Sequence, residues 1–157
     1  MSEYQLAQLN IARMKAELDD PLMAGFVEQL DHVNSIADSS PGFVWRFESD
    51  KGNATDIRAF DDNTLLVNMS VWEDIEQLKA FVYESFHLEL LKRKKEWFHK
   101  FDSVFQVLWW VPTGHRPGVD EAKQRLAYLQ ANGPSEIAFN FQRHFPASGT
   151  ALKLPSA

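Results

Sequence analysis

The stretch TLLVNMSVW, residues 64–72, decides the fold, because apolar residues recur in it at every second position, as in a β-strand. One side of this strand is purely apolar and comprises Leu65, Val67, Met69 and Val71. The other side adds hydrogen-bonding groups and a large aromatic ring, and comprises Leu66, Asn68, Ser70 and Trp72. A sheet of such strands can pack helices on its apolar face and line a semi-polar cavity with its mixed face.

The segment from Tyr4 to Met14 repeats this alternation and predicts a second strand. Its apolar side comprises Ala7, Leu9 and Ile11, and its mixed side comprises Leu6, Gln8, Asn10 and Ala12. Between the two strands, Asp20 and Pro21 are typical of a helix start, and the run Ser39 to Gly42 is typical of a helix end.

The remaining elements follow from periodicity and turn residues. We expect a strand at 43–49, a loop at 50–63, a helix at 73–101 with a break near 85–87, a strand at 104–111, a helix at 119–131 and a short strand around 137–141. This order predicts an α+β, ferredoxin-like split βαβ fold: a four-stranded antiparallel sheet with helices on one face, plus an appended C-terminal helix and short strand.

The mixed face of that sheet is too apolar to stay in water, so we expect a second copy of the chain to cover it. The protein would then be a homodimer. The side chains expected on this face are Leu6, Gln8, Asn10, Val44, Arg46, Leu66, Asn68, Ser70, Trp72, Gln106, Leu108 and Trp110.

Composition restricts the classes of protein. The 157 residues suit one domain, expected at 1–146, with a disordered tail at 147–157. A net charge of −6 argues against nucleic acid as a partner, and the absence of a long apolar run argues against a membrane. No cysteine is present, which excludes disulfides and thiol catalysis, and the N-terminus lacks a signal-peptide pattern. We therefore expect a cytoplasmic protein.

Several segments in this order resemble one known family. They are PGFVWRF (41–47), GNATDIRAFDD (52–62), LLVNMSVWEDIEQLKAFVYESFH (65–87), KRKKEWF (92–98) and LWWVPTGHRP (108–117). The chain is similar in them to the domain of unknown function 3291 family, of the dimeric αβ-barrel superfamily that contains the antibiotic-biosynthesis monooxygenases. The resemblance implies a homodimer whose two sheets close into one dimeric αβ-barrel, but it implies no single reaction, since fold does not fix function.

His87 is the candidate catalytic residue, because an imidazole near a helix break can act as a general base at a pocket mouth. The alternative is a His that caps or packs the helix. Among the possible metal ligands, Glu28 with His32 and Glu96 with His99 have helical spacing, but a solvated face explains them better, so we expect no metal site.

Polar and aromatic side chains supply the candidate ligand-binding residues, because amides and guanidinium groups can orient a carbonyl and indoles can stack on a planar ligand. These residues are Asn10, Arg46, Asn68, Ser70, Trp72, Trp110, His115 and Arg116. The alternative is that the polar groups bond to one another inside a filled barrel. For Trp45, Trp97 and Trp109 we expect packing roles.

Two functions follow from these patterns. The first is a pocket for a small apolar or aromatic molecule that supports oxygenase-like chemistry without a cofactor; haem or flavin stays an open alternative. The second is a non-enzymatic ligand-binding or structural homodimer.

Overall fold

The computed structural model describes residues 3–16, 20–47, 65–84, 96–99 and 106–149. The described strands are β1 (Tyr4–Met14), β2 (Phe43–Arg46), β3 (Leu65–Trp72), β4 (Phe98–His99) and β5 (Gln106–Pro112). The described helices are α1 (Ala24–Asp38), α2 (Ile75–Glu84) and α4 (Val119–Asn132), and a 3-10 turn at Pro21–Met23 leads into α1. No helix in these ranges is long and apolar enough to cross a lipid bilayer.

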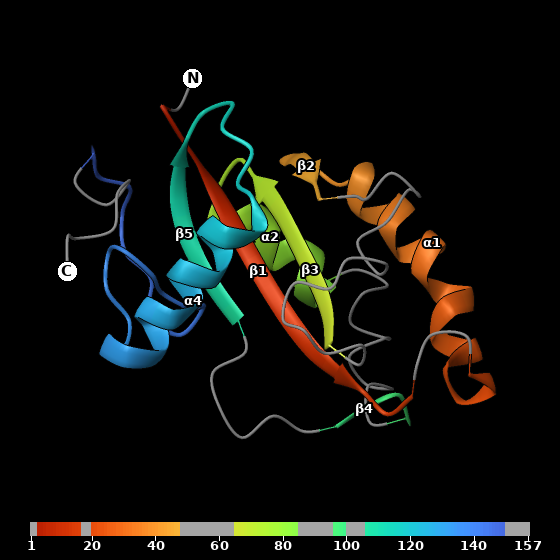
Figure 1. The fold of residues 1–157 in the computed structure, drawn as a ribbon. Coiled ribbons are helices and arrows are strands. Elements are labelled where there is room, and N and C mark those ends of the chain that lie inside the picture. The colour runs from red at the N-terminus through yellow and green to blue at the C-terminus, as the bar shows by residue number, and fades with distance from the viewer. Residues whose placement is uncertain (1–2, 17–19, 48–64, 85–95, 100–105, 150–157) are drawn as a thin grey trace.

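The strands form one antiparallel sheet with β1 at its centre (Figure 1). β3 pairs with one edge of β1 and β2 with the outer edge of β3, whereas β5 and β4 share the other edge of β1. The order β2-β3-β1-β5 is that of a ferredoxin-like split βαβ unit, which confirms the predicted fold class.

Local signals in the sequence explain the ends of α1. The Asp20 carboxylate accepts the Leu22 N–H at 2.9 Å, and Pro21 stands at the first position of the 3-10 turn. Ser39 Oγ and Ser40 Oγ donate to carbonyls of the last turn, those of Ser35 and Ile36. These bonds satisfy carbonyl groups that the helix end leaves without an internal partner.

Two local predictions differ from the structure. Phe98 and His99 were expected in a long helix, but they form the short strand β4 beside Arg13 and Met14 of β1. The expected break of that helix near 85–87 lies outside the described residues, which follow α2 as far as Glu84. The predicted strand around 137–141 is reduced to one bridge, in which the Phe139 and Leu108 backbones exchange two hydrogen bonds.

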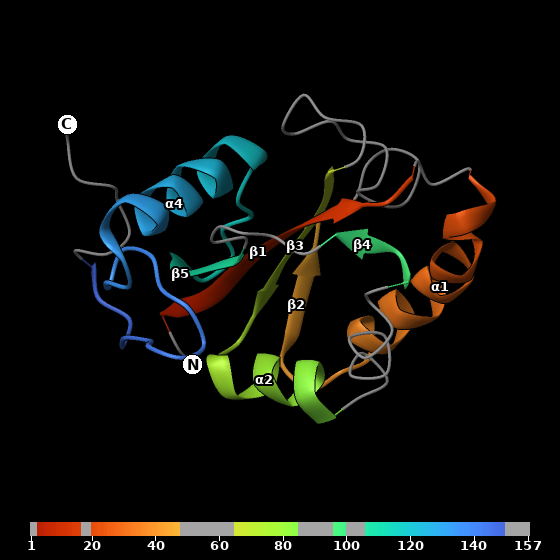
Figure 2. The ribbon, with the colours of Figure 1, turned by 90° about the horizontal axis from the view of Figure 1, so that it is seen from below.

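The helices of the split βαβ unit, α1 and α2, lie on one face of the sheet as expected, but it is the mixed face, and the appended helix α4 covers the apolar face. Figure 2 shows α4 on one side and α2 on the other. The apolar face carries Leu9, Met69 and Trp109, which form one core with Leu126 and Leu129 of α4. The mixed face carries Leu6, Trp72 and Leu108, which form a second core with α2 and with Phe139. The mixed face therefore does not point away from the helices, because α2 and the segment after α4 bury part of it within one chain.

Candidate functional site

Polar side chains gather on the mixed face where β1, β3 and β5 run side by side. Asn10 lies opposite Asn68 on β3 and opposite Gln106 on β5, and Gln8 lies opposite Ser70. Because all five belong to the same strand parity, they point to one side of the sheet. We call Gln8, Asn10, Asn68, Ser70 and Gln106 the polar cluster.

Hydrogen bonds connect one end of the polar cluster into a network. Gln8 Nε2 donates to Asn68 Oδ1 at 2.7 Å and to Ser70 Oγ at 2.8 Å, and Trp72 Nε1 donates to the same Ser70 Oγ at 2.9 Å. Gln8 and Ser70 are only 5% and 6% exposed, whereas Asn68 is exposed. The polar cluster thus has a buried end at Ser70 and an open end at Asn68.

The other amide at the open end is less well satisfied. Asn10 is partly buried, and its Oδ1 atom is buried without a hydrogen-bond donor in the described part of the chain. Buried acceptors are bonded in most proteins, so this orphan oxygen marks an unmet hydrogen bond beside the open end. The exposed Asn68 is therefore the residue best placed to meet a ligand.

Two apolar groups flank the polar cluster on the same face. On one side, Trp72 stacks on Phe81 of α2 with ring centroids 5.2 Å apart and meets the edge of Phe43 at 5.5 Å. On the other side, Met14 packs with Phe26 of α1 and with Trp97. A ligand at Asn68 would therefore lie between these two apolar groups.

The predicted tryptophans of the site have packing roles. Trp72 is 1% exposed, its ring contacts Phe43 and Phe81, and its N–H group donates to Ser70. Trp110 donates from Nε1 to the Phe145 carbonyl at 2.8 Å and lies 6.3 Å from the Phe139 ring. Trp72 is thus buried in the second core beside Ser70, whereas Trp110 is partly buried and packs against that core.

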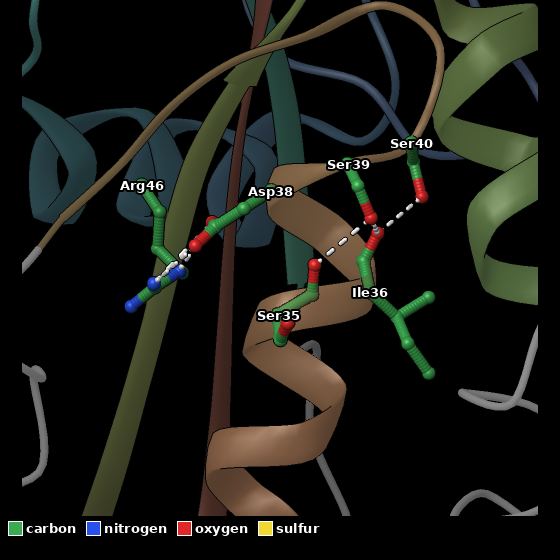
Figure 3. A network of polar contacts seen from close by, with 6 residues as sticks. All are labelled: Ser35, Ile36, Asp38, Ser39, Ser40 and Arg46. Atoms are coloured by element: carbon green, nitrogen blue, oxygen red, sulfur yellow. Dashed lines mark hydrogen bonds and ion pairs between the residues drawn. The ribbon is translucent and has the colours of Figure 1, made fainter.

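Arg46 lies beside Ser70 in the register, but its charge is turned toward α1. Its Nη2 atom lies 3.2 Å from the Asp38 carboxylate, at the end of the helix (Figure 3). The Arg46 side chain is 12% exposed and Asp38 is 49% exposed, so the pair is partly screened by water. This pairing compensates the guanidinium charge next to the polar cluster.

His115 and Arg116 belong to the opposite face, and the structure does not bring them to the polar cluster. His115 Nε2 lies 2.7 Å from Glu121 Oε1, and Trp109 Nε1 donates to Glu121 Oε2 at 2.9 Å. The Arg116 guanidinium lies 5.6 Å from the centre of the Trp45 ring. These contacts hold the loop before α4 against the apolar face, and the role of His115 and Arg116 in ligand binding stays a prediction.

A buried charge on α4 was not predicted. Arg125 is 3% exposed and donates from Nη1 to the Ile137 carbonyl at 2.9 Å. Burial lowers the pKa of Arg125, and the Glu121 charge one helical turn earlier partly offsets this effect. The spacing of Glu121 and Arg125 on a helix was the sequence signal for this pair.

His87 lies outside the described residues, so its role stays a prediction. Within the described ranges, no group of three His, Asp or Glu side chains is placed to hold a metal ion. An open hollow of about 680 Å³ lies between α2 and the C-terminal segment, against Lys79, Tyr83 and Phe141. Its lining residues do not include the polar cluster.

Comparisons with known proteins give one family and three similar structures. The model of the family described as "Domain of unknown function (DUF3291)" matches residues 5–154. No curated protein matches the chain.

The similar structures have low sequence identity. A protein of unknown function from Nitrosomonas europaea is 10% identical, covering 74% of this chain and 95% of its own, with a TM-score of 0.48. A protein of the same organism, described as a proposed antibiotic biosynthesis monooxygenase, is 13% identical, covering 75% and 97%, with a TM-score of 0.48. A protein of that description from Chloroflexus aurantiacus is 16% identical, covering 73% and 98%, with a TM-score of 0.44.

Proposed function

We propose that this chain, which belongs to the DUF3291 family, binds a small, largely apolar molecule at the open end of the polar cluster. The proposal rests on one observation, the exposed Asn68 amide. Its oxygen accepts a hydrogen bond from the buried Gln8, and the amide lies between two apolar groups. Small-molecule sites combine apolar walls with a few fixed polar groups in this way.

The charge of the site favours a neutral ligand. The polar cluster consists of amides and one hydroxyl, which exchange hydrogen bonds but do not change charge at ordinary pH. Arg46, which lies opposite Ser70 in the register, is paired with Asp38. Among the described residues at this site, an anionic ligand would lose its hydration without meeting an uncompensated positive charge, whereas a neutral one loses less.

The same chemistry favours binding and orientation over proton transfer by the polar cluster itself. Oxygenase-like chemistry would need a general base, and His87 is the proposed base. If His87 has this role, His87→Ala abolishes turnover of a bound substrate and leaves the melting temperature nearly unchanged. A variant that loses stability and keeps turnover would indicate a packing role for His87.

A binding screen tests the proposal. We expect planar aromatic ketones, with acetylnaphthalene as the first probe, to quench or shift the tryptophan fluorescence on titration. Asn68→Leu should weaken binding by about tenfold, the effect of one hydrogen bond of roughly 1.4 kcal/mol. Asn132→Leu is the control, because Asn132 is also exposed but lies at the end of α4. Equal binding by wild type and Asn68→Leu would contradict the site.

Homodimerisation stays a proposal of its own. The mixed face does not need a second copy of the chain to cover it at Leu6, Trp72 and Leu108, since these residues are buried within one chain. Half-buried Trp45 and Phe47 at the edge of the sheet are the better candidates for contact with a second copy. Light scattering at micromolar concentration should give the dimer mass if the interface buries about 1,200 Å² or more.

A further inference from the structure

The direction of the hydrogen bonds inside the polar cluster determines what Asn68 offers to a ligand. The Gln8 amide nitrogen carries two hydrogens, and it donates one to Asn68 Oδ1 and one to Ser70 Oγ. Trp72 Nε1, which can only donate, gives a second hydrogen bond to Ser70 Oγ. Gln8 and Trp72 therefore both donate to Ser70, and Gln8 also donates to Asn68.

Asn68 has its oxygen committed by this arrangement. The oxygen and the nitrogen of a carboxamide are bonded to the same carbon and point in different directions. When Asn68 Oδ1 faces the buried Gln8, Asn68 Nδ2 therefore faces away from Gln8. Asn68 is exposed, and no acceptor for Nδ2 is present in the described part of the chain. Two N–H donors are therefore available at the open end.

We propose that Gln8 is a positioning residue that fixes the Asn68 carboxamide with its N–H donors outward, so that the site selects ligands with an exposed acceptor oxygen such as a ketone or quinone carbonyl. This inference rests on the proposed function and adds a substrate class to it. Gln8 is 5% exposed and acts through Asn68, whereas Asn68 meets the ligand.

One substitution tests the direction of the hydrogen bond without any ligand. Asn68→Asp keeps an oxygen for the Gln8 donor and replaces the outward N–H groups by a second oxygen. Its folding equilibrium constant in urea titrations at neutral pH should stay within about threefold of wild type, because a charged acceptor still takes the Gln8 hydrogen bond. A fall of roughly tenfold or more would mean that Gln8 presents its own oxygen to Asn68, and would overturn the inference.

Asn140→Asp is the matched control for the added charge. Asn140 Oδ1 accepts the Arg143 N–H at 2.8 Å, so this substitution also preserves an accepting oxygen in a known hydrogen bond. Asn68→Asp should therefore be no less stable than Asn140→Asp. A clear excess loss in Asn68→Asp alone would count against the assigned direction.

Two probes of nearly equal shape test the selectivity. Acetylnaphthalene carries a carbonyl oxygen where isopropenylnaphthalene carries a CH₂ group. Wild type should bind the ketone about tenfold more tightly, and Asn68→Asp should lose this preference. Gln8→Met should reduce the preference as well, because the Asn68 amide is then free to turn. A purely structural effect of Gln8→Met would weaken both probes equally and leave their ratio unchanged.

The outcomes separate this inference from the proposed function. Equal affinity of wild type for the two probes overturns the selectivity and leaves the binding function in place. Binding of neither probe overturns both. A tenfold preference that disappears in Asn68→Asp and falls in Gln8→Met, with stability retained in Asn68→Asp, supports both.

Discussion

On the face of the sheet that carries Leu9, Met69 and Trp109, apolar side chains pack against α4 and leave almost no surface exposed. On the opposite face, apolar packing is interrupted by the polar cluster, and there the exposure rises toward Asn68. The first face derives its stability mainly from the burial of apolar side chains, whereas the second keeps amides that must bond to one another or to a ligand. A sheet can thus combine a stable core on one face with a binding site on the other.

The largest effect is expected on the apolar face, for Trp109→Ala. Trp109 is fully buried, so the change should lower the free energy of unfolding by about 3–5 kcal/mol, measured by urea denaturation. Trp109→Phe is the control, since it retains an aromatic ring but loses part of the indole and the N–H that donates to Glu121. If Trp109→Ala lost less than Trp109→Phe, the ring would not be the main source of stability on this face.

A smaller effect is expected where α2 meets the mixed face, for Gly42→Ala. Gly42 has a φ of +83°, and a Cβ atom there would overlap the side chain of Gln77. Backbone strain and displacement of Gln77 together should cost about 2–4 kcal/mol in urea denaturation.

Gly114→Ala separates the two causes, because Gly114 also has a positive φ, +91°, but nothing lies within 4 Å of the added Cβ. The excess loss in Gly42→Ala then measures the overlap with Gln77. Equal losses in the two variants would show that Gln77 moves aside freely and that strain alone acts.

Within the polar cluster, Ser70→Ala should cost about 1–3 kcal/mol, because the buried Trp72 N–H and one Gln8 N–H lose their acceptor. Asn68→Leu should cost less, since water can replace Asn68 at the open end. Parallel thermal and urea denaturation of the two variants sharpens the contrast. A greater loss for Asn68→Leu than for Ser70→Ala would reverse the assignment of the buried and open ends.

The smallest effect is expected for Asp38→Asn, which removes the charge opposite Arg46. Asp38 is 49% exposed, so the loss should be about 0.2–1 kcal/mol and should shrink in high salt. Urea denaturation at low and at high salt measures it. A loss of several kcal/mol that salt does not change would mean that Arg46 depends on Asp38 as a buried charge does.

Much of the architecture was predictable because short-range patterns report it directly. Alternation assigned β1 and β3 and sorted their residues into two faces, and turn residues located both ends of α1. The strand β4 was missed because two residues are too few to show a period, and only pairing with β1 makes them a strand. The polar cluster was predicted as a group through its parity, and the shared face is confirmed by the register.

The sequence by itself determined which residues share a face, because side-chain alternation is a property of the strand alone. It did not determine what covers each face, since that depends on the side to which each connection carries its helix. Only the tertiary structure placed α2 over the mixed face, moved His115 and Arg116 to the other side, and turned Gln8 toward Asn68. Hydrogen-bond direction and helix placement arise from contacts between segments that are distant in the chain, and no local pattern encodes them.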